Sequence, residues 1–401
     1  MTTSPSPGRP AARPGRDREN RRVLVLTSST GGGHDMRARA LQAWSRTGEG
    51  RRCGLHVEIH QTLENTHGVY EFGVRLYNRI QQFWPKLHHL YFHFLEHAGL
   101  HDAATKIWGR DRFLRRVRDF RPHLLVSTHA HLNHGFFELA RWGLPDQPLR
   151  TVTYCGELAG GYGFSRHWVN PRVDLFMGAV EETCGEAAHL GVPEERLWRG
   201  GFLLHPDFYA EAAPDSRAQL CERLQLDPGR FLLVLSTGAN GANNHLRALR
   251  ALCAARVHPQ VIALCGRSTE TVTAVEEWGR RHPELTVRAL PFVDQMRPLL
   301  QSADALVARA GTGTTSEAIL TRCPLIFNGI GGSMPQEELT LKYARKYGFG
   351  RRLSRTHQLP GIVREWMTDP GRLRAESGTM ARIAPDRHPL MILDRLASLV
   401  P

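Results

Sequence analysis

The sequence predicts an α/β fold built from two Rossmann-like halves, and three observations carry that prediction. Apolar runs typical of buried strands alternate with helical segments, which indicates parallel sheets covered by helices. Each half begins with a strand, a glycine turn and a helix, first in "VLVLTSSTGGGHDMRARAL" and again in "FLLVLSTGANGANNHLRAL". The length of 401 residues exceeds what one ordinary core needs, so two domains are expected.

The first half is predicted to contain five strands. The apolar runs place them at 23–27, 55–63, 150–158 and 173–180, and within 123–135, where a strand runs into a polar loop. A helix over 34–46 follows the glycine turn, and another covers 182–192. The aromatic and amphipathic segment 70–100 is predicted to be helical with a break near Pro85.

The second half repeats the pattern after a proline-marked change of domain. Prolines at 206, 214 and 228 surround one short helical stretch. The stretch 231–249 is then predicted to form a strand, a glycine turn and a helix, and further strands follow at 261–266, 285–290, 304–314 and 324–332. Helices are predicted at 315–322 and 336–347. The expected organisation is therefore a disordered tail at 1–20, a first domain at 21–205, a linker region at 206–229, a second domain at 230–385, and a C-terminal helix at 386–401 that packs back on the first domain.

Composition narrows the function classes. No apolar run is long enough for a membrane span, and residues 1–20 lack the apolar core of a signal peptide. The net charge of +13 comes almost entirely from arginine, and no nucleic-acid reader motif accompanies it. An anionic membrane surface or a phosphorylated ligand fits this charge better. Seven scattered cysteines without a CxxC pair indicate reduced thiols and a cytoplasmic protein.

The stretch "ARAGTGTTSEAILTRCPLIFNG" at 308–329 is the strongest candidate binding motif. A strand ends at Arg309, and Gly311 and Gly313 allow close approach of a ligand to the backbone. Thr314 and Thr315 are expected to cap the next helix, whose free N–H groups suit a diphosphate. Glu317 would lie in the first turn and accept hydrogen bonds from a ribose diol. The alternative is a structural glycine turn in which Glu317 only offsets the helix dipole.

A second helix start points to the same cleft. In "GGSMPQEE" at 331–338, Gln336 and Glu337 would project from a helix N-terminus, and amide and carboxylate groups bind sugar hydroxyls well. An ordinary acidic first turn is the alternative. The predicted nucleotide-binding set is completed by Gly238, Arg267 and Phe292.

These motifs together resemble the GT-B glycosyltransferases of family 28. "TGGGH", "ARAGTGTTSEAI" and "PQEE" are similar to that family, which includes the monogalactosyl- and glucosyl-diacylglycerol synthases and the peptidoglycan N-acetylglucosaminyltransferase. "LLVSTHAHLNHG", "VTYCGEL" and "HWVNPRVDLFMGAVEET" resemble the glycolipid branch more closely. The resemblance runs from about residue 23 to residue 350.

The resemblance implies a role for each matching residue of the second half. Glu317 would bind the ribose of a UDP-sugar, Gln336 and Glu337 would read its sugar, and the turn at 311–315 would hold the diphosphate. Arg267 or Arg309 would help to neutralise the leaving group. No Asp-x-Asp motif is present, which favours transfer without a metal or other cofactor.

The first half would then bind the acceptor. The expected acceptor residues are Gly32, Gly33, His34, Asn133, His134 and Trp168. His34 would take the proton of the attacking hydroxyl, because histidine titrates near neutral pH. Asp35, Glu157 and His129 are rival bases.

Several residues depart from the glycolipid pattern. Ser29 replaces an aspartate, Asp35 replaces a basic residue, Glu157 replaces an aspartate, and "GGYGFSRH" is inserted at 160–167. These departures lie mostly around the acceptor side. Two histidine trios, 129/131/134 and 89/93/97, are possible zinc ligands, with a polar loop and a solvated helix face as the alternatives.

The predicted function is an inverting, metal-independent hexosyl transfer from a UDP-sugar to a lipid, diacylglycerol above all, at the inner face of a membrane. The segment 69–100 mixes aromatic and basic side chains as an interfacial helix does, although a buried helix is the alternative. A polyprenyl-linked or soluble secondary-metabolite acceptor, a UDP-sugar 2-epimerase and a sugar-nucleotide binder without turnover remain open. The sequence specifies neither the sugar nor the oligomeric state.

Overall fold

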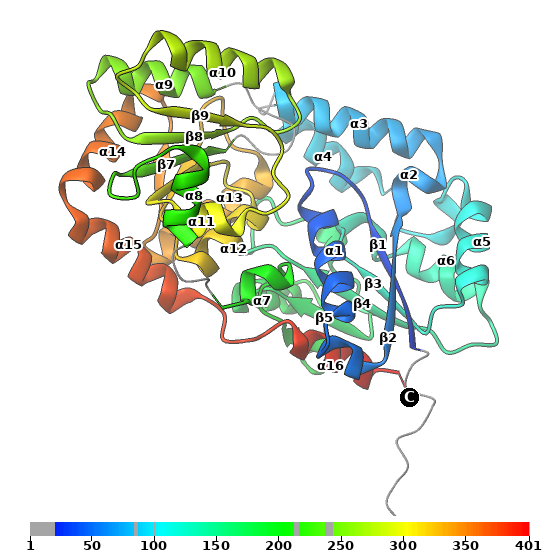
Figure 1. The fold of residues 1–401 in the computed structure, drawn as a ribbon. Coiled ribbons are helices and arrows are strands. Elements are labelled where there is room, and N and C mark those ends of the chain that lie inside the picture. Colours follow the sequence, from blue (N-terminus) through cyan, green and yellow to red (C-terminus); the bar gives the residue numbers. More distant parts are fainter. Residues whose placement is uncertain (1–20, 84–86, 100, 212–215, 237–243, 401) are drawn as a thin grey trace, which may run out of the picture.

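A computed structural model describes residues 21–83, 87–99, 101–211, 216–236 and 244–400, and it contains two parallel six-stranded sheets. The tail at 1–20, Pro85 and Gly238 lie outside the described residues, and so do the predictions that concern them. Figure 1 shows the two sheets in two lobes, each with helices around it. This arrangement confirms the predicted α/β fold of two Rossmann-like domains.

The first domain contains the sheet with strand order β2-β1-β3-β4-β5-β6. Its strands are β1 (Arg21–Thr27), β2 (Leu55–Gln61), β3 (Leu124–Ser127), β4 (Arg150–Cys155), β5 (Leu175–Gly178) and β6 (Leu197–Arg199). Its helices are α1 (Gly33–Arg46), α2 (Thr62–Thr66), α3 (Gly68–Phe83), α4 (His88–Ala98), α5 (Arg110–Phe120), α6 (Gly135–Gly143) and α7 (Glu181–His189).

The second domain contains the sheet with order β12-β11-β10-β7-β8-β9. Its strands are β7 (Leu232–Ser236), β8 (Gln260–Leu264), β9 (Val287–Leu290), β10 (Ala305–Ala308), β11 (Leu325–Asn328) and β12 (Arg351–Leu353). Its helices are α8 (Ser216–Leu224), α9 (His245–Ala254), α10 (Thr269–Arg281), α11 (Arg297–Ser302), α12 (Thr312–Thr321), α13 (Pro335–Tyr347), α14 (Leu359–Thr368) and α15 (Pro370–Ile383).

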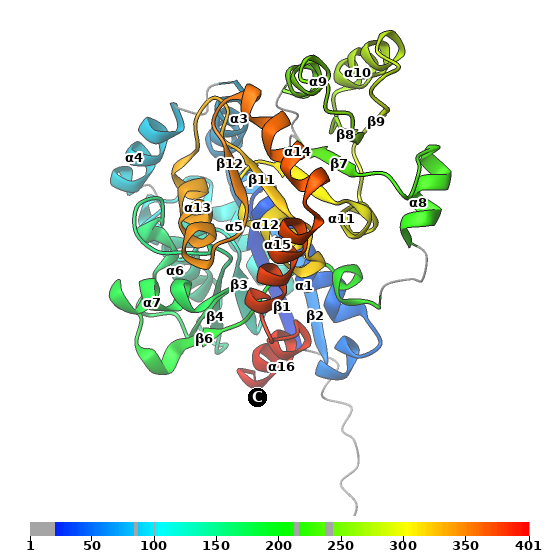
Figure 2. The same cartoon turned by 90° about the vertical axis from the view of Figure 1, so that its left-hand side faces the viewer.

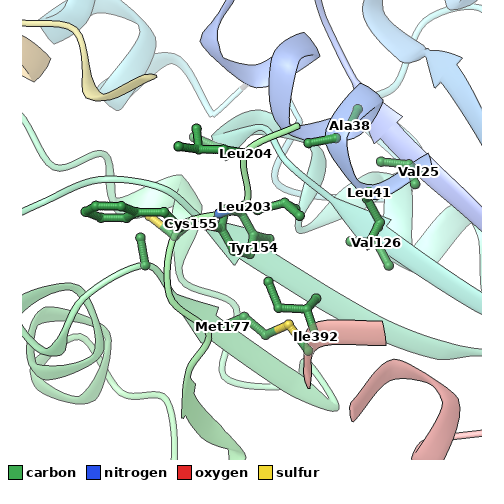
Figure 3. Close-up of a cluster of buried hydrophobic side chains, with 14 of the residues drawn as sticks. Val25, Ala38, Leu41, Val126, Tyr154, Cys155, Met177, Leu203, Leu204 and Ile392 are labelled. Atoms are coloured by element: carbon green, nitrogen blue, oxygen red, sulfur yellow. Dashed lines mark hydrogen bonds between the residues drawn. The ribbon is translucent and has the colours of Figure 1, made fainter. Parts of the chain in front are cut away.

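Central strands are apolar along their whole length because helices cover both faces of a parallel sheet. In β1 the residues from Val23 to Thr27 are all buried, and Val23 pairs in register with Val57 of β2 and Leu124 of β3. Figure 3 shows Ala38 and Leu41 of α1 beside Val25 and Val126 of this sheet. This packing fixes the helix that follows the first glycine turn.

The chain returns to the first domain at its end. Helix α16 (Leu390–Ser398) buries Ile392, Leu393 and Leu396, and it packs against α1. Ile392 lies near Met177 of β5 in Figure 3, and α16 lies under the first domain in Figures 1 and 2. Among the described helices, none combines the length and the apolar character that a membrane span requires.

Candidate active site

Two cavities meet between the domains, where loops leave the carboxyl ends of the strands, as expected for open α/β sheets. The inter-domain cavity has a volume of about 390 Å³ and lies between the starts of α1, α12 and α13. The apolar cavity has a volume of about 670 Å³ and lies between α3, α4 and the loops after β3 and β4. Both cavities are lined by Thr30, His34, Tyr77, Glu157 and Gln336.

The start of α12 forms one wall of the inter-domain cavity. Gly311 is the N-cap with extended backbone, and the helix begins at Thr312. Gly313 faces α1 so closely that a Cβ there would lie 3.0 Å from Met36 Cε. Because Gly311, Thr312, Gly313 and Thr314 all line the cavity, the free N–H groups of this helix end are available to an anion.

The helix boundary corrects two expectations. Thr314 and Thr315 lie within α12 and cap nothing, and Thr315 is fully buried. Glu317 lies in the second turn and not the first, so it does not offset charge at the helix start. The threonines suggested a cap, but the helix already starts at the residue that follows Gly311.

Glu317 lines the inter-domain cavity, and its surroundings shift the pKa of its carboxyl group. Burial raises the pKa of its carboxyl to about 7, and the positive charge of Arg37 offsets part of that rise. Glu157, at the end of β4, has a pKa raised to about 7 for the same reasons. Its Oε2 atom is buried and has no hydrogen-bond partner among the described residues. Both carboxyl groups can therefore exchange a proton or accept a hydrogen bond near neutral pH.

Arg309 and Glu337 bind each other. Arg309 Nε and Nη2 donate to the two oxygens of Glu337 at 2.8 and 2.5 Å, and Met334 N donates to Glu337 Oε2 at 2.8 Å. This bidentate pair uses most of the hydrogen-bonding capacity of both residues. Gln336, by contrast, has a buried Oε1 without a hydrogen-bond partner among the described residues, so it is the member of the pair at 336–337 that can accept a bond from a ligand.

His34 has one ring nitrogen fixed and one free. Its Nδ1 lies 2.8 Å from the Thr128 carbonyl oxygen, and a carbonyl only accepts, so Nδ1 carries the hydrogen. The Nε2 atom then holds a lone pair, and the described residues offer it no hydrogen bond. Burial, with a contribution from Arg37, lowers the pKa of His34 to about 4. The imidazole is therefore neutral and able to accept a proton at physiological pH.

Two rival bases are fully engaged. His129 Nδ1 accepts from His131 N at 3.2 Å, and its Nε2 lies 2.9 Å from Thr30 Oγ1, so neither nitrogen is free. Asp35 accepts from Gln61 and Arg39 and lines neither cavity. His34 and Glu157 remain as the groups with an unused acceptor atom at the junction of the cavities.

The expected acceptor residues divide into two groups. Trp168 lines the apolar cavity, with its ring 5.7 Å from that of His34, while Gly32 and Gly33 line the inter-domain cavity. Asn133 and His134 line neither cavity. The buried amide of Asn133 donates to the carbonyls of His129, Ala130 and His167, which makes it a structural residue of this loop.

The remaining nucleotide-binding candidates lie at the edge of the inter-domain cavity. Phe292 lines it, and the guanidinium of Arg267 lies over the Phe292 ring at 4.5 Å from the centroid, a cation–π contact. Arg267 itself does not line the cavity. No three His, Cys, Asp or Glu side chains of the described residues are arranged to hold a metal ion.

Sequence reasoning missed Arg37, Thr30 and Tyr77, although all three line the inter-domain cavity. Arg37 had a usable signal, because it follows His34 by three residues on a helix and therefore shares its face. The sequence gives no comparable signal for Thr30 and Tyr77, since only the folded chain brings the loop after β1 and helix α3 together.

Comparisons with known proteins show which families this chain resembles. Residues 231–328 match the model of the glycosyltransferase family 28 C-terminal domain. The chain is 23% identical over 363 residues to the chloroplastic monogalactosyldiacylglycerol synthase of Spinacia oleracea, covering 86% of this chain and 66% of the relative. It is 20% identical over 359 residues to the processive diacylglycerol beta-glucosyltransferase of Staphylococcus carnosus, covering 88% and 87%. The chain thus spans about two thirds of the plant relative's length.

Solved structures share the fold. MurG of Acinetobacter baumannii superposes with a TM-score of 0.58 at 13% identity, covering 94% of this chain and all of the other. Anabaena HepE in complex with UDP superposes with a TM-score of 0.54 at 13% identity, covering 95% and 99%. The two six-stranded sheets have the GT-B architecture of these solved structures, and residues 231–328 of the second domain match glycosyltransferase family 28.

Proposed function

We propose that the protein is an inverting glycosyltransferase that moves a hexose from a UDP-sugar to a hydroxyl group of a lipid, with diacylglycerol as the first candidate acceptor. The observation that supports it most is the position of His34, whose free Nε2 belongs to a side chain that lines both cavities. A donor in one cavity and an acceptor in the other would meet at this residue.

The donor would occupy the inter-domain cavity. The N-terminal turn of α12 offers N–H groups to the diphosphate, Glu317 accepts hydrogen bonds from the ribose, and Gln336 Oε1 accepts one from the sugar. These groups bind an anionic diphosphate through backbone N–H donors, so we propose that transfer needs no metal. The UDP complex of HepE supports the choice of nucleotide.

The acceptor would occupy the apolar cavity. Its walls include Val69, Leu76 and Phe92, and the exposed rings of Phe72 and Phe94 lie at its rim. Such a cavity suits an acyl chain, and the names of the spinach and Staphylococcus relatives support a diacylglycerol. The apolar rim on α3 and α4 would let the protein take its acceptor from a membrane surface as a peripheral protein.

The reaction would proceed as one displacement. The acceptor hydroxyl attacks the anomeric carbon from the side of the apolar cavity, and its proton passes to His34 Nε2. The bond between the anomeric carbon and the β-phosphate oxygen breaks, and its electron pair leaves with UDP. Attack opposite the leaving group inverts the anomeric configuration.

A donor screen tests this function. Purified protein is incubated with a panel of UDP-sugars and diacylglycerol in anionic liposomes, and UDP release and new glycolipid are followed together. Glu317→Ala and His34→Ala are measured beside Glu338→Ala, a control on the outer part of α13 whose side chain contacts Arg352.

The expected result is UDP and glycolipid formation that is lost in the first two variants and kept in the control. Nucleotide-sugar binding that depends on Glu317, but without glycolipid, would replace the acceptor with a polyprenyl-linked or soluble one. Isomerised UDP-sugar without an acceptor would indicate an epimerase, and binding without any turnover would indicate a sugar-nucleotide-binding protein. Absence of binding to every nucleotide sugar would overturn the proposal.

A further inference from the structure

The charges that line the inter-domain cavity are unbalanced for a diphosphate site. Four carboxyl groups line it, those of Glu157, Asp294, Glu317 and Glu337, and Arg37 is the single cation among its described lining residues. Arg309, one of the two arginines predicted for the leaving group, does not line the cavity, and its ion pair with Glu337 offsets the charge of that one carboxylate only. Any favourable charge for an anionic ligand must come from Arg37 and from the helix N-termini.

Arg37 is held in place from both domains. On α1 it is 4% exposed, and its Nη2 donates to the Gly156 carbonyl oxygen at 3.0 Å and to Thr312 Oγ1 at 2.6 Å. Its Nη1 donates to the Gly33 carbonyl oxygen at 3.3 Å. Residue 156 must be glycine, because a Cβ there would overlap the guanidinium. Hydrogen bonds to both domains thus hold this side chain in one position at the start of α12.

This buried guanidinium lacks a counter-ion. No carboxylate of the described residues lies within 4.0 Å of it, and its Nε and one Nη1 hydrogen have no acceptor there. A buried cation without an ion pair is costly, because burial removes its hydration and three neutral acceptors replace only part of it. An anionic group of a ligand would supply the missing partner, and it would find the N–H groups of Thr312 and Gly313 beside it.

We propose that Arg37 binds the donor diphosphate and stabilises the charge that develops on it as the sugar leaves. The inference rests on the proposed function. The new bond joins the acceptor oxygen to the anomeric carbon, and the broken bond leaves its electron pair on the β-phosphate oxygen that Arg37 faces. The acceptor proton goes to His34. The base, His34, and the cation at the leaving group, Arg37, are therefore one helical turn apart on α1.

This assignment makes the reaction depend on contact between the domains. Arg37 belongs to the first domain, while Thr312 and the diphosphate-binding helix end belong to the second. The cation reaches the leaving group only while α1 and α12 are in contact, as they are in this structure. Transfer would therefore be restricted to the closed arrangement, which limits hydrolysis of the donor by water.

The test compares three substitutions of Arg37 with a control on the same helix. Arg37→Met removes the charge, Arg37→Gln removes it but keeps donors for Gly156 and Thr312, and Arg37→Lys keeps a charge of different shape. Arg39→Met is the control, because Arg39 is 72% exposed and pairs with Asp35 outside both cavities. Titration calorimetry measures the affinity for UDP and for uridine, and steady-state assays measure kcat and KM for the UDP-sugar.

We expect kcat to fall by about 10²–10³-fold in Arg37→Met and Arg37→Gln, as it does when one transition-state donor is removed. UDP should bind more weakly in both variants while uridine binds as before, and Arg37→Lys should recover part of the loss. Arg39→Met should match the wild type in every readout.

An unchanged ratio of UDP to uridine affinity in a folded Arg37→Gln variant would overturn the inference, even with reduced kcat. A wild-type protein that binds neither UDP nor any UDP-sugar would instead overturn the proposed function itself. Thermal melting of each variant separates loss of binding from loss of fold, and Arg37→Gln remains informative if Arg37→Met does not fold.

Discussion

At the scale of single residues, the identity of the base can be decided by pH. His34 must be neutral to accept a proton, and burial holds its pKa at about 4, whereas Glu157 must be ionised and has a pKa of about 7. If His34 is the base, kcat/KM should stay level as the pH falls from 7 to 5 and decline only towards pH 4. If Glu157 is the base, the decline should begin near pH 7.

The matched variants for that profile are His34→Gln and Glu157→Gln. We expect His34→Gln to lower kcat by about 10²–10⁴-fold at every pH, the usual contribution of a general base. Glu157→Gln should keep the acid limb near pH 4 and change KM more than kcat. A profile with its acid limb near pH 7 that vanishes in Glu157→Gln would transfer the role from His34 to Glu157.

The same residues show what sequence alone could and could not establish. His34 and Glu317 follow glycine turns after strands, a spacing that places them at the cleft whatever the packing. Arg37 is defined instead by its burial and by the fact that it forms no ion pair with the described residues, and both are properties of the folded chain. Likewise, only the tertiary structure shows that Arg309 forms an ion pair with Glu337 and that the Asn133 amide donates to carbonyl oxygens of its own loop.

At the scale of elements, the sequence predicts the buried strands from their apolar runs but does not predict the short edge strands. The buried strands β1 and β10 were predicted from continuous apolar sequence. The edge strands β6 and β12 have three residues each and are largely unburied, so their sequences lack that signal. Thr314 and Thr315 predict a helix start that is too late in the sequence, because the N-cap of α12 is Gly311.

The inserted loop at 160–167 contacts one helix of each domain, α4 and α13. His89 of α4 lies 2.7 Å from Tyr162 Oη through Nδ1 and 2.9 Å from the Ser333 carbonyl oxygen through Nε2. Lys342 of α13 donates to the Gly160 carbonyl oxygen at 2.8 Å. Gly163 has φ +96° and lies directly against the Pro335 carbonyl oxygen at the start of α13. The loop therefore fixes the helix end that presents Gln336.

We expect Gly163→Ala to disrupt this contact. An alanine Cβ would overlap the Pro335 carbonyl oxygen, and the positive φ adds about 1 kcal/mol of backbone strain. The melting temperature should fall and KM for the UDP-sugar should rise, since Gln336 would move. Gly185→Ala in α7 is the control, because a Cβ there meets no atom within 4 Å. Equal melting temperatures and KM values for the two variants would contradict this role of the loop.

The apolar rim of α3 and α4 has a separate test. Phe72 is 65% exposed and Phe94 is 62% exposed, which is costly in water unless a membrane or another apolar partner covers them. Phe72→Asp with Phe94→Asp should abolish co-sedimentation with anionic liposomes and leave UDP binding intact. Trp142→Asp is the control, since Trp142 is 50% exposed on α6 and lines neither cavity. Equal loss in the control would indicate a general effect of added charge.

At the scale of the whole molecule, the floor of the apolar cavity is a cluster of histidines. The ring centroids of His34 and His129 are 4.5 Å apart, those of His129 and His131 5.7 Å, and those of His131 and His101 5.9 Å. Burial is the main cause that lowers the pKa of all four, to about 4 for His34 and His101 and well below the usual value for His129 and His131. Asp102 and Arg166 lie beside the adjoining His167.

The sign of the resulting pH dependence follows from these shifts. In the unfolded chain the histidines take up protons near pH 6.5, while in the folded protein they remain neutral until about pH 4 or below. Between these values the unfolded state binds more protons, so stability is full above pH 6.5 and is lost as the pH falls. By pH 5 the shifts of His34 and His101 each cost on the order of 2 kcal/mol, and the lowered pKa values of His129 and His131 act in the same direction.

We therefore expect the free energy of unfolding of the first domain to decrease between pH 6.5 and pH 5. The raised pKa of Glu157 acts in the opposite direction over this range and offsets part of the decrease. Denaturant unfolding at pH 7.5, 6.5 and 5.5 measures the slope of stability against pH, which counts the protons taken up on unfolding. His101→Gln should reduce that slope by about one proton, because burial lowers the pKa of His101 to about 4 in the folded protein. A stability that does not change between pH 7.5 and 5.5 would contradict the lowered pKa values of the cluster, and the acid limb of kcat/KM should then appear near pH 6.5 instead of pH 4.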